Sequence, residues 1–314
     1  MAALIVVAAI LCVGAGVTFF GSIWIERAYP PRGRFIEVAG GRQHVVELGG
    51  AAGAAKAPPL VLLHGAGANL GDMRLALGEP LAAKQYRVIL VDRPGLGWSE
   101  RKGCDAASVA AQAAILREVL DRLGLDRSIL VGHSFGGTLA LAFALAYPER
   151  VAGLVLIAAP THPGMRFLTW ISAGLSTPLG WLFAHTLALP FGAIFIAPGT
   201  RTAFRPQTPP HHYLRRTATL LVLRPASLLA NWADVGGLEK LLAEQIEHYA
   251  KLAAPTIAVV GDRDVIVPPK EHISELAVVA SHVKVVELNG FGHMLHHAAA
   301  NRVIAAIEEL AGKN

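Results

Sequence analysis

Short apolar runs alternate with longer amphipathic segments along most of this chain. Runs that suit buried strands stand at residues 60–63, 87–91, 127–131, 152–158, 256–260 and 283–288. Between them, residues 108–123 carry apolar side chains on one helical face, and residues 137–147 form an apolar helix that ends before Pro148. This alternation predicts an α/β fold, a mostly parallel central sheet with helices on both faces. Two alternating segments, 35–38 and 43–48, predict a hairpin ahead of it.

The first apolar stretch is of a different kind. Residues 2–25 carry no charge, and as a helix they would be about 36 Å long, enough to cross a bilayer. We interpret the stretch as a single N-terminal transmembrane anchor, not a cleaved signal peptide, because no basic residue precedes it and it continues past a small-residue position near Ala15. Arg27, Arg32 and Arg34 follow it, which favours a cytoplasmic catalytic domain but leaves the side of the membrane open.

The strand and helix alternation stops after residue 158. About ninety residues then precede the next strand, far more than an ordinary α/β connection, and they predict a separate helical cap. The predicted domains are an anchor (1–28), a first core part (29–160), the cap (161–251) and a second core part (252–314).

The first part of this cap is strongly apolar. Met165 to Ile196 contains one cation and no acid, and Pro178 and Pro190 should break it into pieces too short to span a bilayer singly. These pieces either pack on the catalytic domain or present a lipid-facing or acyl-binding surface.

Composition supports a membrane association and excludes other partners. Apolar residues make up 53% and charged residues 16% of the 314 residues, which is too apolar for an ordinary soluble enzyme of this size. The net charge of +5 comes without any run of Lys or Arg longer than two, so no nucleic-acid partner is expected. Cys12 in the anchor and Cys104 in a loop make no disulfide framework.

One pentapeptide carries the strongest chemical signal. Gly132-His133-Ser134-Phe135-Gly136 stands directly between an apolar strand and a helix. A G-x-S-x-G turn at such a place holds its serine in a strained conformation and exposes the hydroxyl beside a helix N-terminus. The free N–H groups there can stabilise an oxyanion, so Ser134 is a candidate nucleophile.

Further polar residues follow the carboxyl ends of the other apolar strands. They are His64-Gly65-Ala66-Gly67, Asp92 to Ser99, Gly261 to Asp264, and Gly290 to His293. Ligands bind at this edge of open α/β sheets, and the order Ser, Asp, His along the chain suits a hydrolase.

A serine nucleophile needs a base and a residue that orients the base. His293 is the candidate base, because it lies on a loop just after a strand. Asp262 and Asp264 are equivalent candidates for the acid on the residues alone, since either could brace the turn. The H-x-x-H spacing of His293 and His296 lacks an accompanying Cys or carboxylate, so no metal site is expected. We assign structural roles to His64, Asp92 and His133.

Four motifs in register, HGAG, DRPGLGWS, GHSFGG and GDRDVIVP with GFGH, show that the chain resembles the α/β-hydrolase superfamily over about residues 33–312. The resemblance implies a Ser134, Asp264, His293 triad, with Asp264 placed four residues before Pro268. It also implies an oxyanion hole from the backbone N–H groups of Ala66 and Phe135, and no cofactor or metal. Branches that open epoxides or displace halides place a carboxylate where this chain has its elbow serine.

We therefore expect a membrane-anchored serine hydrolase that cleaves carboxylic esters of lipophilic acyl or aromatic substrates through an acyl-enzyme. The alternative is a C–C bond hydrolase of diketone-type ring-fission products, because HGAGAN resembles the HGxGPG loop of that branch. Acyl transfer or a perhydrolase reaction, and a non-enzymatic hydrolase-like receptor, are further alternatives. The natural substrate and the oligomeric state stay open.

Overall fold

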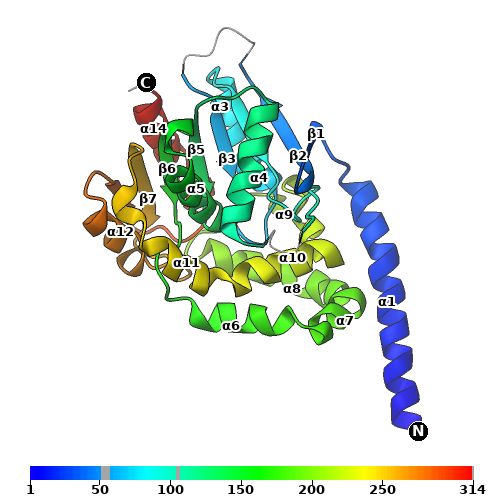
Figure 1. Cartoon of the computed structure of the whole chain (residues 1–314). Coiled ribbons are helices and arrows are strands. Elements are labelled where there is room, and N and C mark those ends of the chain that lie inside the picture. The colour runs from blue at the N-terminus through cyan, green and yellow to red at the C-terminus, as the bar shows by residue number, and fades with distance from the viewer. Residues whose placement is uncertain (51–56, 104–106, 313–314) are drawn as a thin grey trace.

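The computed structural model describes residues 1–50, 57–103 and 107–312. Within them, eight strands form one sheet in the order β1-β2-β4-β3-β5-β6-β7-β8 (Figure 1). The β1–β2 and β2–β4 pairs are antiparallel, and all other pairs are parallel. The strands are β1 (Arg34–Val38), β2 (Gly41–Leu48), β3 (Leu60–Leu63), β4 (Val88–Val91), β5 (Ser128–His133), β6 (Val151–Ile157), β7 (Thr256–Gly261) and β8 (Lys284–Leu288). The predicted α/β fold with a mostly parallel sheet is confirmed.

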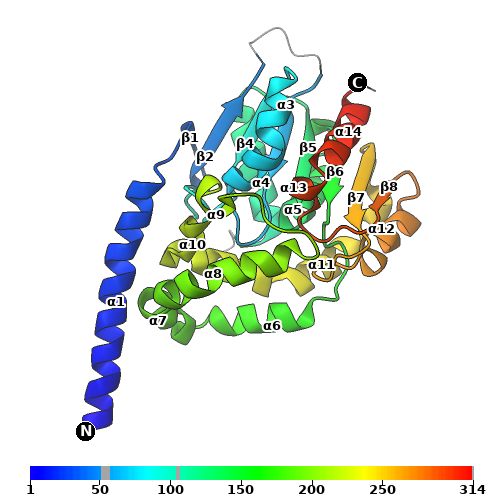
Figure 2. The ribbon, with the colours of Figure 1, turned by 180° about the vertical axis from the view of Figure 1, so that it is seen from behind.

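Helices cover both faces of this sheet. On one face lie α4 (Val109–Arg122) and α5 (Phe135–Ala146), and on the other lie α3 (Glu79–Ala83) and α14 (Ala300–Ala311) (Figures 1 and 2). Every residue of β3, β4, β5 and β6 is buried, because strands covered on both sides must be apolar along their whole length. Shorter core elements are α2 (Leu70–Met73), the π-helix η1 (Arg74–Gly78), α12 (Ile273–Val279), α13 (Leu295–Ala298) and the 3₁₀ turns η2 (Pro148–Arg150) and η5 (Pro269–Glu271).

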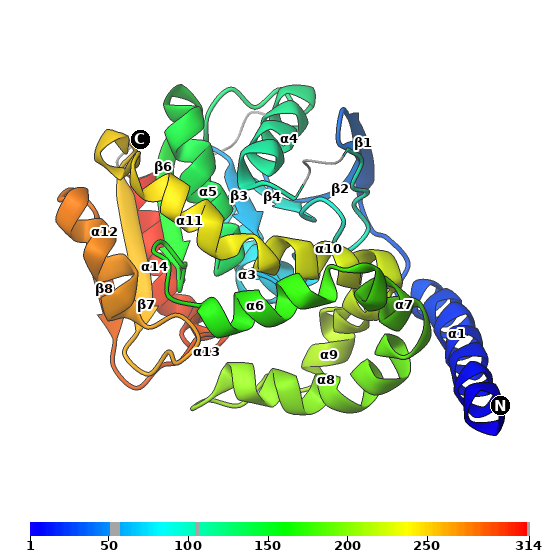
Figure 3. The same cartoon turned by 60° about the horizontal axis from the view of Figure 1, so that its bottom comes forward.

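The chain between β6 and β7 is helical and lies across the carboxyl ends of the strands (Figures 1 and 3). We call this part the cap. Its elements are α6 (Arg166–Leu175), α7 (Pro178–Thr186), α8 (Ala188–Phe204), α9 (Tyr213–Arg216), η3 (Thr219–Leu223), α10 (Pro225–Gly236), α11 (Leu238–Ile246) and η4 (Tyr249–Lys251).

The prediction of a helix break at Pro178 is confirmed, whereas the prediction of a break at Pro190 is wrong. Pro178 starts α7, with the Thr177 hydroxyl as its cap. Pro190 lies in the first turn of α8. The N–H groups of a first turn make no hydrogen bond within the helix, so the missing N–H of proline is tolerated there and the helix continues to Phe204. The break between α7 and α8 falls at Leu187 instead, with a bend of 79°.

The N-terminal helix α1 (Ala2–Ala28) is the one helix in the described chain that by itself is long and apolar enough to cross a membrane. Its N-terminal end projects away from the body (Figure 1). Its second half packs on the cap, where the Thr18 hydroxyl donates to the Thr186 carbonyl at 2.8 Å and Ile25 is buried against Leu189 and Leu223. The C-terminal half of α1 is therefore part of the packed structure of the cap.

Candidate active site

Ser134 lies at the sharp turn between β5 and α5. Its backbone has φ 51° and ψ −125°, a region that residues with a side chain rarely adopt. A Cβ at Gly132 would lie 2.3 Å from the Gly136 carbonyl, and one at Gly136 would lie 2.3 Å from the Leu63 carbonyl. Both glycines are required by this close approach of strand and helix, so the turn has the geometry of a nucleophile elbow.

His293 and Asp264 meet from neighbouring loops. The Nδ1 of His293 lies 2.8 Å from Oδ2 of Asp264, and both side chains are buried. The other Asp264 oxygen accepts hydrogen bonds from the N–H groups of Ile266 and Val267, each at 2.9 Å. Asp262 is exposed and braces the neighbouring turn by accepting from the Gly290 N–H at 2.6 Å. The geometry thus separates two aspartates that are equivalent in the sequence.

Ser134 and His293 line one pocket of about 470 Å³ beneath the cap. Among the described residues, no hydrogen bond joins the Ser134 hydroxyl to His293. In unliganded sites such bonds are often long and shorten only when substrate is bound.

The two expected oxyanion donors also line this pocket. Phe135 is the first residue of α5, so its N–H has no acceptor within the helix. The hydrogen bonds of the described chain use neither this N–H nor that of Ala66. The next residue, Gly67, donates to Asn231 Oδ1 of α10 at 2.6 Å, which ties the loop to the cap.

His64 holds the same loop in place. Its Nε2 accepts from the Arg93 N–H at 3.0 Å, and its Nδ1 lies 2.9 Å from the Gly65 carbonyl. Burial, helped by the charge of Arg93, lowers the pKa of His64 to about 4, so the ring is neutral near pH 7. The contacts support the structural role expected for it.

A buried cluster beside the site was missed by sequence reasoning. The Oδ1 of Asp72 accepts from the Tyr213 hydroxyl and lies 2.7 Å from His297 Nε2, while its Oδ2 lies 2.9 Å from His296 Nε2. Burial alone would raise the pKa of Asp72, but the two histidines hold it well below its ordinary value. His296 and His297 lie in the short helix α13, which precedes the last helix α14.

This cluster contacts the loop that carries His293 through His133. The His133 Nε2 lies 3.1 Å from the His293 carbonyl oxygen, and its ring packs on that of His296 with centroids 3.9 Å apart. The atoms of Asp72, His133 and His296 that could bind a metal ion lie within 4.8 Å of one another. The Asp72 oxygens already face three hydrogen-bond partners, Tyr213, His296 and His297, and the His133 and His296 rings pack on each other. This arrangement favours a hydrogen-bonded cluster that supports the His293 loop over a metal site.

The rest of the pocket is apolar and comes mostly from the cap. None of its described lining residues is Lys or Arg, and the ionisable ones are Asp72, His133, Tyr213 and His293. The large apolar residues of the cap that line it are Met165, Phe195, Ile196, Phe204, Leu223, Val235 and Leu238.

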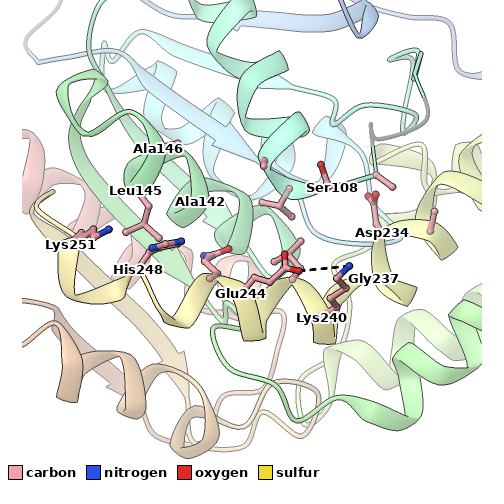
Figure 4. A pocket seen from close by; sticks show the side chains of 16 residues that line it. Ser108, Ala142, Leu145, Ala146, Asp234, Gly237, Lys240, Glu244, His248 and Lys251 are labelled. Atoms are coloured by element: carbon pink, nitrogen blue, oxygen red, sulfur yellow. Dashed lines mark ion pairs between the residues drawn. The ribbon is translucent and has the colours of Figure 1, made fainter.

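A larger cavity, of about 670 Å³, lies elsewhere (Figure 4). It is lined by the start of α4, by α5 and by α10 and α11, and none of the candidate catalytic residues faces it. Figure 4 shows the Lys240–Glu244 ion pair at its rim, with atoms 3.8 Å apart. The Ser108 hydroxyl there caps α4, and Asp234 pairs with Arg93, so both already have structural partners.

Comparison with known proteins places the chain in a family. The family model for the alpha/beta hydrolase fold matches residues 58–185. A 2-hydroxymuconate semialdehyde hydrolase from Pseudomonas putida is 34% identical over 200 residues, which cover 58% of this chain and 67% of that protein. This chain belongs to the α/β-hydrolase superfamily, as its motifs predicted.

Other similarities are shorter or concern the fold. A 2-hydroxy-6-oxononadienedioate/2-hydroxy-6-oxononatrienedioate hydrolase from Paraburkholderia phymatum is 42% identical over 118 residues, and the chain thereby spans only 41% of that relative's length and 37% of its own. A thermophilic esterase from Thermogutta terrifontis superposes with a TM-score of 0.71 over 90% of this chain and 99% of its own, at 24% identity. At that identity, the likeness shows the fold alone.

Proposed function

We propose that this chain is a serine hydrolase that attacks a carbonyl carbon through Ser134. The observation that carries the proposal is the convergence of a strained elbow serine and a His293–Asp264 pair on one pocket. Those are the parts of a nucleophile, a general base and an orienting acid.

The reaction follows from these positions. His293 takes the hydroxyl proton as Ser134 attacks, and Asp264 stabilises the imidazolium that forms. The N–H groups of Ala66 and Phe135 hold the oxygen of the tetrahedral intermediate. The proton on His293 then passes to the leaving group, and His293 activates a water molecule that releases the acyl group from Ser134.

Two kinds of bond remain candidates for cleavage. The names of the curated relatives favour C–C bond hydrolysis over the ester hydrolysis that the sequence put first. The lining of the pocket gives separate evidence on the charge of the substrate. A dioate of the kind named for the Paraburkholderia relative carries two carboxylates, and the described lining offers no Lys or Arg to pair with them. We therefore propose an uncharged lipophilic substrate, either a ketone cleaved beside its carbonyl or a carboxylic ester.

We also propose that α1 anchors the protein in a membrane. Its 27 residues have a mean hydropathy of 2.6 over the most apolar window, and 11% of that window is buried. Side chains of this kind are stable in lipid and costly in water.

Replacing the nucleophile tests the proposal. Ser134→Ala should lower kcat by about 10⁴ to 10⁶ on an activated ester or a neutral diketone, whichever the enzyme accepts. The wild type should react with a fluorophosphonate probe and the variant should not, while Ser281→Ala, at an exposed serine, should behave as the wild type. Probe labelling or turnover that survives in Ser134→Ala would refute the assignment. The ratio of kcat/KM for diketone and ester decides which bond is cleaved.

A further inference from the structure

The first three cap helices are built from an uncharged stretch of chain. No Asp, Glu, Lys or Arg occurs between Arg166 and Arg201, and His185 is the only titratable residue there. This stretch forms nearly all of α6, α7 and α8. In an ordinary soluble cap, the outer helical faces would carry charged side chains.

Large apolar side chains of these helices point outward. The exposed fractions are 74% for Trp170, 75% for Leu179, 54% for Trp181, 49% for Phe191, 66% for Ile194 and 62% for Phe195. We call these six residues the outer cap face. Large exposed apolar side chains gathered on three successive helices mark an interaction site.

Helix α1 packs against two of these three helices, α7 and α8. A Cβ on Gly14 would lie 2.8 Å from the Thr186 carbonyl, and one on Gly21 would lie 3.1 Å from the Leu189 side chain. These close approaches, the Thr18 hydrogen bond and the buried Ile25 hold α1 against α7 and α8 from residue 14 to residue 25. From residue 14 to residue 25 the helix rises about 16 Å, roughly half the hydrocarbon thickness of a bilayer.

The charges beside α1 mark where that contact ends. Glu26 pairs with Arg224 of the cap at 3.1 Å, immediately after the apolar part of the helix. At the other end, the N-terminal turns of α1 project past α7 (Figures 1 and 2) and expose Leu4, Ile5 and Val7. A bilayer that covers α1 from its N-terminus to Ile25 therefore also covers the part of the cap packed against it.

We propose that α6, α7 and α8 lie within one leaflet, beside the C-terminal half of α1, with lipid acyl chains against the outer cap face. This inference rests on the membrane anchoring proposed for α1. It also gives the substrate a route, because Phe195 both lines the Ser134 pocket and belongs to the outer cap face. The substrate class is accordingly a lipophilic carbonyl compound dissolved in the bilayer.

Site-directed labels in full-length protein test the immersion. With Cys12 and Cys104 replaced by Ser, single cysteines at Leu179, Ile194, Val7 and Val278 would carry an environment-sensitive fluorophore, in phosphatidylcholine nanodiscs that hold one copy. Val278 is the matched control, since it is 78% exposed but lies on α12, apart from α6, α7 and α8 (Figure 1). Doxyl groups on the lipid chains and aqueous iodide are the two quenchers, and fluorophosphonate labelling confirms that each variant is folded.

Positions 179 and 194 should be quenched several-fold more by doxyl lipid than position 278, and several-fold less by iodide. Iodide quenching equal to that at position 278 would place the outer cap face in water and overturn the proposal. Protection of positions 179 and 194 from both quenchers would show that protein covers the outer cap face, and it would overturn the proposal as well. Doxyl quenching at position 7 without quenching at 179 and 194 would retain the anchor and refute only the immersed cap, whatever the activity on esters or diketones.

Discussion

At the scale of single residues, the choice between Asp262 and Asp264 decides the catalytic assignment. Asp264→Asn should lower kcat by about 10⁴, because the variant no longer stabilises the protonated His293 ring or holds its tautomer. Asp262→Asn is the matched control, since its carboxylate accepts from the Gly290 N–H in an exposed turn and makes no hydrogen bond or ion pair with His293 among the described residues. Steady-state rates on one activated substrate compare them. An Asp262 variant as impaired as the Asp264 variant would show that the turn, and not the carboxylate pair, limits activity.

A second residue-scale prediction concerns pH and stability. His64 is buried, and its pKa falls from 6.5 to about 4 on folding, chiefly through desolvation. Below pH 6.5 the unfolded chain therefore binds a proton that the folded chain does not, so stability is complete above pH 6.5 and declines as the pH falls toward 4. The effect of one such group is on the order of 3 kcal/mol.

The apparent melting temperature in detergent should accordingly drop between pH 7 and pH 5. His64→Gln keeps an acceptor for the Arg93 N–H but has no titrating ring, so its drop should be smaller. His211→Gln, at an exposed histidine, should leave the drop unchanged. An identical pH dependence in the wild type and His64→Gln would contradict the assignment.

At the scale of elements, the sequence predicted the features that are set by residues close together in the chain, and it did not predict contacts between residues far apart. The parallel strands were predictable because burial on both faces forces a continuous apolar run. The elbow was predictable because Gly132 and Gly136 are needed within five residues of chain. The Asp72 cluster was not, because Tyr213 and His296 reach Asp72 across 141 and 224 positions. Nor could apolarity alone show that α1 packs on the cap, since lipid and protein contacts select the same side chains.

The wall formed by the cap over the pocket leads to a prediction about substrate length. Phe195, Ile196 and Phe204 of α8 line the pocket with apolar surface. Each methylene buried there should contribute about 0.8 kcal/mol, so the four that separate butyrate from octanoate should raise kcat/KM about a hundredfold. Rates for p-nitrophenyl acetate, butyrate, octanoate and laurate give the comparison. A steady fall from acetate onward would mean that the apolar wall lies out of reach of the acyl chain.

At the scale of the whole molecule, α1 and the cap should bind the membrane independently. Deleting residues 1–28 leaves every candidate catalytic contact in place, since all of them join residues beyond Gly33. The deletion also uncovers Leu189 and Leu223, which pack against Ile25. The truncated chain should therefore keep its esterase or diketone turnover while melting at a lower temperature than the full chain. It should still float with phosphatidylcholine vesicles, because the outer cap face remains.

Two further substitutions separate the cap from the anchor. Leu179→Glu with Ile194→Glu removes two exposed apolar side chains, each worth about 1.5–3 kcal/mol when buried in lipid. In the truncated chain, vesicle binding should then fall by about a hundredfold or more. In the full chain the same pair should leave the protein in the membrane fraction, because the anchor proposed for α1 is unchanged. Release of the truncated chain into water without these substitutions would mean that α1 alone holds the enzyme at the bilayer, and the substrate would then reach Ser134 from the aqueous side.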